Sequence, residues 1–119
     1  MKNVLIIGSK GFLGKHIKNK LKGNFKIFEL NRSNGDYTKS KYYVKFKKID
    51  FIIMAAGLVS VTQSWKNPKI FLEKNYIGTL NVLEFCRKQN SKLIFISSYL
   101  YGNSKVLPTN EKQLLKSLN

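Results

Sequence analysis

The chain has 119 residues and 43% of them are hydrophobic, which suits one domain with a buried core and excludes an intrinsically disordered chain. Its apolar runs are too short for a membrane span or a signal peptide, and its one cysteine excludes an internal disulfide. The net charge of +16 comes mostly from scattered lysines, because only Arg32 and Arg87 among the 22 basic residues are arginines. We therefore expect a cytoplasmic domain with no metal site and no specific nucleic-acid partner, although weak, salt-sensitive attraction to polyanions remains.

Strand, helix and strand alternate over the first part of the chain. The unbroken apolar run Asn3–Gly8 predicts a strand that is buried on both faces. Lys26–Leu30 predicts a second strand, which a turn at Asn31–Gly35 follows. Tyr42–Lys48 fits either a short helix or an irregular connection. Between the two strands, apolar residues at every fourth position predict an amphipathic helix: Leu13, Ile17 and Leu21.

The same alternation continues through the second half. Asp50–Ala56 predicts a third buried strand, and Lys92–Ser98 predicts a fourth. Asn67 and Pro68 begin a long helix that should run to about Lys88. We expect this helix to bury five residues: Phe71, Leu72, Leu80, Leu83 and Cys86. The pattern predicts an α/β fold, a Rossmann-type doubly wound parallel sheet of about four strands, which is incomplete.

A glycine-rich segment, Gly8-Ser9-Lys10-Gly11-Phe12-Leu13-Gly14, lies where the first strand turns into the first helix. Glycines at such a turn allow a tight bend, a close approach of the backbone to a diphosphate, and packing of the helix on the strand. The amides at the helix N-terminus then face the negative charge. We therefore expect a dinucleotide at this turn. Lys10 either adds a charge near the phosphates or is an ordinary solvated lysine.

Three further motifs follow the third strand, the start of the long helix and the fourth strand: Ala55-Ala56-Gly57-Leu58-Val59-Ser60-Val61, Asn75-x-x-Gly78-Thr79-x-Asn81-x-Leu83-Glu84, and Ile96-Ser97-Ser98-Tyr99-Leu100-Tyr101-Gly102. With the G-x-x-G-x-x-G turn, they resemble the extended branch of the short-chain dehydrogenase/reductase superfamily. In this branch the similarity is to the NAD-dependent epimerase/dehydratase proteins, which act on nucleotide-linked sugars. The resemblance extends from Asn3 to about Gly102.

The resemblance implies a role for each matching position. The turn Gly8–Gly14 would hold the cofactor diphosphate, with Gly8, Gly11, Phe12, Leu13 and Gly14 as the matching residues. Asp36 and Tyr37 would lie beside the adenine. Ala55, Ala56 and Gly57 would line the ribose side of the cofactor, and Asn75 would order the site from the long helix. Ser97 matches the catalytic Ser/Thr position, and Ser98 is the alternative.

The segment after the second strand bears on the choice between NAD and NADP. An acidic residue there binds the ribose 2′-hydroxyl of NAD, but this chain has Asn31-Arg32-Ser33. A carboxylate repels a 2′-phosphate, whereas the Arg32 guanidinium would pair with it. We therefore expect NADP to be preferred over NAD. The alternative is that Arg32 is a solvated turn residue.

The family's hydride chemistry uses a Tyr-x-x-x-Lys pair on a helix after the serine strand. The pattern occurs at Tyr37/Lys41, Tyr43/Lys47 and Tyr101/Lys105, which is little more than chance gives in a lysine-rich chain. The first two pairs precede the serine strand, and the third begins in a turn only four residues beyond Ser97. We therefore expect a cofactor platform and a serine without the acid/base pair or the substrate-binding C-terminal region.

The expected function is the NAD(P)-binding portion of a nucleotide-sugar epimerase, dehydratase or reductase, whose complete form takes a nucleotide-linked sugar. The alternative is a non-catalytic dinucleotide-binding module with a regulatory or partner role. Residues 1–102 would form the Rossmann half-domain and residues 103–119 a weakly patterned tail. An incomplete sheet leaves an exposed edge, which favours self-association. We expect His16 on the surface, and Cys86 and Trp65 in the core.

Overall fold

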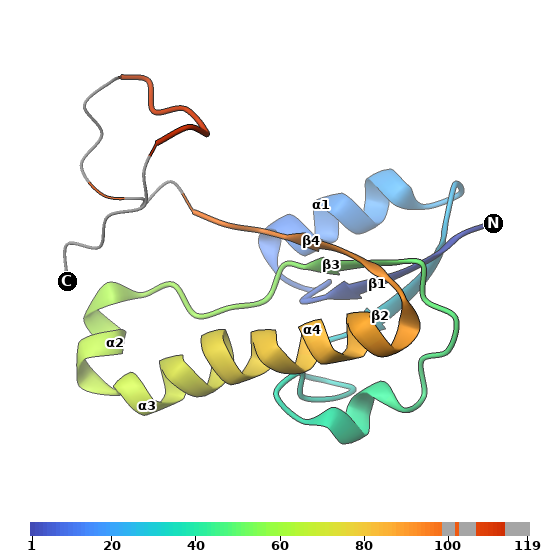
Figure 1. The fold of residues 1–119 in the computed structure, drawn as a ribbon, viewed down its shortest axis with the longest axis horizontal. Coiled ribbons are helices and arrows are strands. Elements are labelled where there is room, and N and C mark those ends of the chain that lie inside the picture. The colour runs from blue at the N-terminus through green and yellow to red at the C-terminus, as the bar shows by residue number, and fades with distance from the viewer. Residues whose placement is uncertain (99–101, 103–106, 114–119) are drawn as a thin grey trace.

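The structure, a computed structural model, describes residues 1–98, 102 and 107–113. Within these residues four strands form one parallel sheet in the order β2-β1-β3-β4 (Figure 1). They are β1 (Asn3–Ile7), β2 (Lys26–Leu30), β3 (Phe51–Met54) and β4 (Lys92–Phe95). The predicted α/β fold with a parallel sheet is confirmed, although β3 and β4 end earlier than the apolar runs suggest.

Helices cover both faces of this sheet. Figure 1 shows α1 (Phe12–Leu21) on one face and α4 (Gly78–Gln89) on the other. The long helix predicted from Pro68 is present as three consecutive segments: α3 (Pro68–Phe71), the π-helical segment η2 (Leu72–Ile77) and α4. The short helix α2 (Val61–Lys66) precedes them, and the undecided connection contains one 3-10 turn, η1 (Ser40–Tyr43).

The core has two halves because successive strand residues point to opposite faces. Leu5 and Ile7 of β1 are fully buried on the α4 face, where they pack in one cluster with Val82 and Phe85. The alternate residues Val4 and Ile6 form a smaller cluster under α1, together with half-buried Ile17 and Leu21. The central strands β1 and β3 are therefore buried on both faces, as their continuous apolar runs predicted, whereas β4 is largely exposed.

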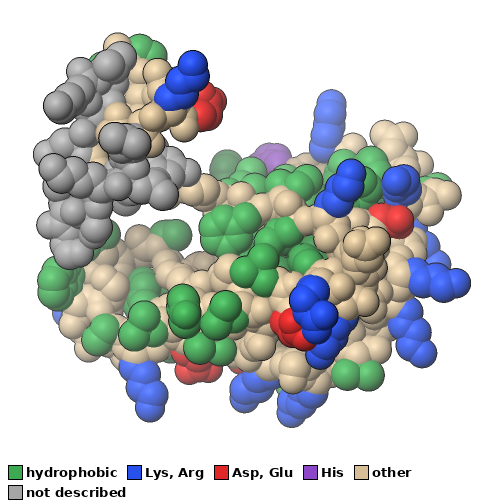
Figure 2. All heavy atoms as spheres, viewed as in Figure 1, with side chains coloured by type: hydrophobic (Ala, Val, Ile, Leu, Met, Phe, Trp, Pro, Cys, Tyr) green, Lys and Arg blue, Asp and Glu red, His purple; other side chains and the backbone are tan. Residues whose placement is uncertain are grey.

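The prediction for the buried face of the long helix is wrong in part. Cys86 is buried, but Leu72, Leu80 and Leu83 are 64%, 45% and 46% exposed. The residues that face the sheet are Val82, Phe85 and Cys86, which lie on the opposite side of α4. Apolar residues occupy both sides of this helix, so spacing alone did not identify the side that packs on the sheet. Figure 2 shows the exposed hydrophobic side chains gathered along the long helix and over β4.

Two of the three single-residue expectations hold. His16 is exposed on α1, and Cys86 is a small core residue. Trp65 is 75% exposed on α2, so its predicted place in the core is wrong. Helix α2 has no buried residue among those described. Within the described residues, no helix combines the length and the apolar character that a membrane crossing requires.

Candidate cofactor site

The glycine-rich turn packs directly on the neighbouring strand ends. Gly8 has φ +86°, and a Cβ built on it would lie 2.9 Å from the backbone nitrogen of Ala56. A Cβ on Gly14 would collide with the carbonyl oxygen of Gly8. Larger residues at these two positions would therefore push the turn away from β3 and away from α1. The sequence requires glycine here for both reasons, conformation and space.

Helix α1 begins at this turn without a side-chain cap. Its N-cap is Gly11, whose amide donates to the carbonyl of Gly8 (3.0 Å), and among the described residues no side chain caps the helix. The first turn also contains no acidic residue, and Phe12 is 85% exposed. Among the described residues, no side-chain cap and no first-turn acid therefore compensates the positive end of the helix dipole. A cofactor diphosphate fits this arrangement, because it would accept hydrogen bonds from the first-turn amides.

The loop after β3 forms the second wall of the site. β1 and β3 are adjacent in the sheet, but β2 comes between them in the sequence and lies on the other side of β1. The strand order therefore reverses between β1 and β3. Ligands of open α/β sheets bind where the strand order reverses. The Asn75 side chain reaches the loop from η2, accepting from the Leu58 amide (2.8 Å) and donating to the Leu58 carbonyl (2.8 Å). Asn75 therefore holds Ala55, Ala56 and Gly57 opposite the glycine turn.

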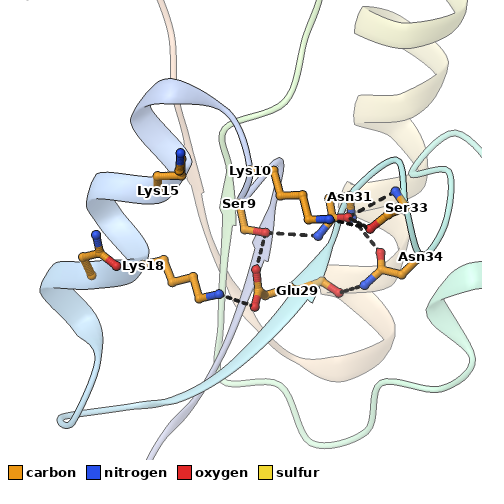
Figure 3. Close-up of a pocket in the computed structure, with 9 residues that line it drawn as sticks. Ser9, Lys10, Lys15, Lys18, Glu29, Asn31, Ser33 and Asn34 are labelled. Atoms are coloured by element: carbon orange, nitrogen blue, oxygen red, sulfur yellow. Dashed lines mark hydrogen bonds and ion pairs between the residues drawn. The ribbon is translucent and has the colours of Figure 1, made fainter.

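A pocket of about 420 Å³ opens beside the glycine turn, between α1 and the end of β2 (Figure 3). Three of its lining residues are lysines: Lys10, Lys15 and Lys18. Among the described residues that line it, Glu29 is the one acid. The pocket therefore has a net positive charge, which suits an anionic group.

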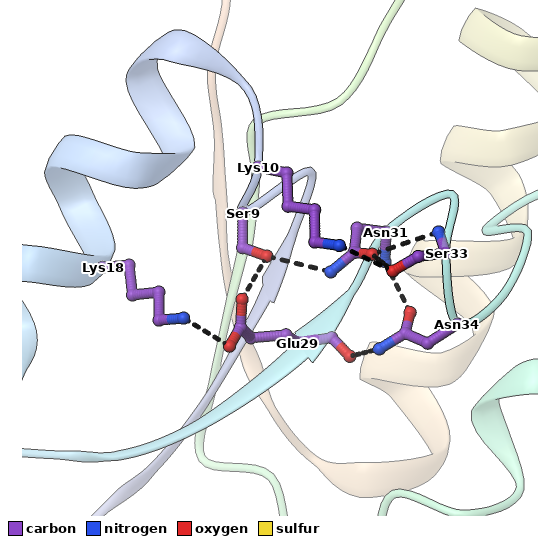
Figure 4. Close-up of polar contacts among 7 residues, drawn as sticks. All are labelled: Ser9, Lys10, Lys18, Glu29, Asn31, Ser33 and Asn34. Atoms are coloured by element: carbon purple, nitrogen blue, oxygen red, sulfur yellow. Dashed lines mark hydrogen bonds and ion pairs between the residues drawn. The ribbon is translucent and has the colours of Figure 1, made fainter.

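A continuous chain of hydrogen bonds crosses the pocket floor (Figure 4). Ser9, only 2% exposed, donates from Oγ to Glu29 Oε2 (2.5 Å) and accepts from Asn31 Nδ2 (3.3 Å). Asn31 Oδ1 accepts from Ser33 Oγ (2.6 Å), and Ser33 Oγ accepts from Lys10 Nζ (2.9 Å). The glycine turn and the turn after β2 are thus joined by side chains. The structure therefore brings Ser9, Lys10, Asn31 and Ser33 together at one place.

Glu29 was missed by the sequence argument. Its carboxylate accepts from Lys18 Nζ at 2.6 Å, and this hydrogen bond, followed by the one from Ser9, holds the pKa of Glu29 below its usual value. Glu29 is therefore a charged group in the pocket at neutral pH. The signal in the sequence was a carboxylate between apolar residues of the strand Lys26–Leu30, because such a group requires a partner.

Asp36 and Tyr37 lie where the turn after β2 meets the long helix. The Asp36 carboxylate accepts from the amide and hydroxyl of Thr38 and pairs with Lys74 (3.0 Å). Burial opposes ionisation, but these bonds outweigh it and lower the pKa of Asp36. The half-buried Tyr37 ring packs against Gly78, where a Cβ would collide with it. This contact explains a glycine inside the helix.

The predicted serines follow β4. Ser97 and Ser98 are exposed at its carboxyl end, the edge of the sheet that also carries the glycine turn. Tyr101 and Lys105, which form the third Tyr-x-x-x-Lys match, lie outside the described residues. The described residues contain no group of three or more His, Cys, Asp or Glu side chains placed to hold a metal ion.

A four-stranded parallel sheet covered on both faces, with a glycine turn where its order reverses, is a Rossmann-type α/β fold. The sequence profile of the NAD dependent epimerase/dehydratase family matches residues 4–119. The chain therefore belongs to this family, and the resemblance inferred from the motifs is confirmed.

Several relatives show how this chain compares with longer proteins. A putative UDP-glucose 4-epimerase of Methanocaldococcus jannaschii is 28% identical over 137 residues, covering 98% of this chain and 45% of that protein. A crystal structure of UDP-glucose 4-epimerase from Bifidobacterium longum, in complex with NAD+ and UDP, is 25% identical with a TM-score of 0.83, covering 93% of this chain and 42% of that one. The dTDP-4-dehydrorhamnose reductase of Bacillus anthracis, in complex with NADP, is 28% identical with a TM-score of 0.73, covering 78% and 35%. The chain spans less than half the length of these three relatives.

Proposed function

We propose that this chain supplies the NAD(P)-binding part of a nucleotide-sugar epimerase, dehydratase or reductase. The observation that carries the proposal is the glycine turn, which packs on Ala55 and Ala56 and leaves the N-terminus of α1 uncapped. The diphosphate binds at Gly11–Gly14, and Ala55–Gly57 line the ribose side. Asp36 and Tyr37 lie beside the adenine. The relatives in complex with NAD+ or NADP support the cofactor class.

Isothermal titration of the chain with NADPH, NADH and a DNA duplex tests this function. The proposal predicts saturable, one-to-one binding of a reduced cofactor, because the turn provides one diphosphate site. It predicts only weak binding to DNA that disappears at moderate salt, because the lysines are scattered. Tight duplex binding without cofactor binding would contradict the proposal and favour a basic nucleic-acid-binding domain.

We propose further that NADP is the preferred cofactor. The turn after β2 offers Asn31, Arg32 and Ser33 and no carboxylate, and Lys10 Nζ lies 2.9 Å from Ser33 Oγ. Arg32 is exposed, so its guanidinium is accessible to a ligand. A 2′-phosphate there gains charge-assisted hydrogen bonds that the 2′-hydroxyl of NAD cannot form.

Substitution of Arg32 tests this preference. Arg32→Ala should weaken NADPH binding roughly tenfold and leave NADH binding almost unchanged, because one charge-assisted contact to phosphate contributes about 1.5–3 kcal/mol before solvent screening. Arg87→Ala is the matched control, since Arg87 is exposed and pairs with Glu84 on α4. An unchanged ratio of the two dissociation constants in Arg32→Ala would refute this role.

For catalysis we propose Ser97, with Ser98 as the alternative, as the catalytic serine of the complete enzyme. No tyrosine follows Tyr101 in the 119-residue sequence, so a Tyr-x-x-x-Lys pair further beyond this serine is absent from it. We therefore expect cofactor binding without turnover of nucleotide-linked sugars. A non-catalytic binding module gives the same result. The coding sequence after Asn119 separates the two, because an in-frame Tyr-x-x-x-Lys would identify a catalytic enzyme.

We also propose that residues 1–102 form the cofactor-binding half-domain, with residues 103–119 outside it, and that the chain self-associates when alone. Beyond β4 the described residues add no further strand, and Ile94 and Phe95 are about half exposed there. An exposed parallel edge and an apolar helix face favour association of two chains.

A further inference from the structure

Lys18 and Glu29 form a charge pair inside the pocket that borders the proposed cofactor site. Lys18 is on α1, about one turn beyond Gly14, and Glu29 is on β2. Their side chains are 40% and 29% exposed, so the pair is only partly screened by solvent. Figure 3 shows both side chains directed into the space between α1 and β2.

The hydrogen-bond chain connects this pair to the turn proposed to read the ribose. From Glu29 it runs through Ser9 and Asn31 to Ser33, and it ends at Lys10 (Figure 4). Every hydrogen bond in this series is donated toward Glu29, because its carboxylate can only accept. Glu29 therefore orients the Ser9 hydroxyl, and Ser9 in turn accepts from the Asn31 amide. A carboxylate fixes the geometry of this turn.

The same carboxylate presents an electrostatic problem for NADP. A 2′-phosphate carries close to two negative charges at neutral pH and would sit in the pocket that Glu29 lines. An unpaired carboxylate a few ångströms from a phosphate repels it, which is the usual reason that an acidic residue near the ribose selects NAD. Here the acid comes from inside β2 and is paired with a lysine, so its charge is compensated.

We propose that Lys18 is a specificity-determining positioning residue: by neutralising Glu29 it permits a 2′-phosphate in the pocket and so sets the preference for NADP over NAD. This inference rests on the proposed cofactor function. Lys18 acts through Glu29 and does not need to touch the cofactor. The Glu29 carboxylate has a structural role, because it orients the Ser9 hydroxyl. Lys18 compensates its negative charge, which would otherwise repel the 2′-phosphate.

The competing explanation is that the pair only ties α1 to β2. If the pair were only structural, breaking it would weaken the binding of both cofactors to the same degree. The proposal instead requires a change in the ratio of the NADH and NADPH dissociation constants, because the two ligands differ only in the 2′-phosphate. That ratio is therefore the readout.

The experiment is calorimetric titration of the whole 119-residue chain with NADPH and with NADH at low salt, for wild type and four variants. Lys18→Met removes the lysine and leaves Glu29 uncompensated. Glu29→Gln removes the charge but keeps an oxygen that accepts from Ser9. The double variant restores the net charge of the pocket. Lys20→Met is the matched control, because Lys20 is exposed on the same helix and does not line the pocket.

Lys18→Met should lower the preference for NADPH roughly three- to tenfold, as expected for one unit charge several ångströms from a phosphate near the protein surface. Glu29→Gln should raise it, and the double variant should return it to within about twofold of wild type. Lys20→Met should leave it unchanged. An unaltered ratio in Lys18→Met, or no recovery in the double variant, overturns the inference while NADPH and NADH still bind. Failure of both cofactors to bind wild type overturns the proposed function itself.

Discussion

At the scale of single residues, the glycines of the first turn determine whether a site exists at all. Gly14 has no room for a side chain because the backbone of Gly8 occupies the space, and backbone cannot move aside as a flexible side chain can. Gly23, by contrast, has φ +92° and nothing within 4 Å of a built Cβ. The two glycines are thus required for different physical reasons, one steric and one conformational.

Gly14→Ala should therefore lose NADPH binding and about 3 kcal/mol or more of stability, because the helix must move away from the turn. Gly23→Ala should lose only about 1–2 kcal/mol, the cost of a left-handed conformation for alanine, and should retain binding. Urea unfolding and cofactor titration of both variants measure these effects. Equal behaviour of the two variants would show that the turn does not require close packing.

The pKa of Glu29 gives a pH-dependent prediction. Because Lys18 and Ser9 hold this pKa below the ordinary 4.5, the interaction stabilises the protein fully above that pH and is lost as the pH falls through the lowered value. We expect wild type to exceed Glu29→Gln by no more than about 1 kcal/mol at pH 7, since the pair is partly exposed. This difference in stability between wild type and Glu29→Gln should disappear in strong acid. Thermal melts of both proteins from pH 7 into strong acid test this, and a stability difference that does not change with pH would contradict it.

At the scale of elements, the long helix is positioned by a contact with the turn after β2. The Tyr37 ring lies on Gly78, and Asn81 Nδ2 donates to the Thr38 carbonyl (2.6 Å) one turn further along α4. The same turn is tied back to the helix by the Asp36–Lys74 pair. The segment proposed to contact the adenine is therefore held against α4 and η2 rather than left as a free loop.

Gly78→Ala should destabilise the chain by about 1–3 kcal/mol, because the new methyl group collides with the Tyr37 ring. The cost should be much smaller in a Tyr37→Leu background, where the ring is absent, so the two substitutions should not be additive. A double-mutant cycle of unfolding free energies measures this coupling. Additive effects would mean that the ring moves away at no cost.

The order of helices and strands was largely predictable from the sequence, but the orientation and the partners of some side chains were not. The β1 run Asn3–Ile7 and the helix after it were evident because burial on both faces leaves a continuous apolar run. The outward direction of Leu80 and Leu83 was not, because helical spacing cannot tell which of two apolar faces meets the sheet. The glycine turn was found from local chemistry. The role of Glu29 was not, because its partners Ser9 and Lys18 are distant in sequence.

At the scale of the whole molecule, apolar surface remains uncovered along one side. Leu72, Leu80 and Leu83 on the long helix and Ile94 and Phe95 on β4 are all exposed by 45% or more. Contiguous apolar patches of this kind mark interaction surfaces (Figure 2). The net charge of +16 opposes close approach of two copies at low salt, so association should increase as salt screens it.

Leu80→Glu combined with Leu83→Glu should therefore reduce self-association without loss of cooperative unfolding, because both side chains are on the surface. Phe85→Ala is the contrast: Phe85 is only 8% exposed, so the substitution should cost about 3–5 kcal/mol. Sedimentation velocity at low and high salt, with thermal unfolding, separates the two effects. A sharp wild-type monomer at all salt concentrations, with cooperative unfolding, would contradict the proposed association.

The proposed function requires that amide groups at the start of α1 donate hydrogen bonds to a cofactor diphosphate. The most direct measurement is a two-dimensional ¹⁵N–¹H NMR titration of the chain with NADPH, with residue assignments. If these amides bind the diphosphate, the amide signals of Gly11, Phe12, Leu13 and Gly14 should shift most, and they should saturate together. Binding of NADPH that leaves these four signals in place, while others move, would contradict it.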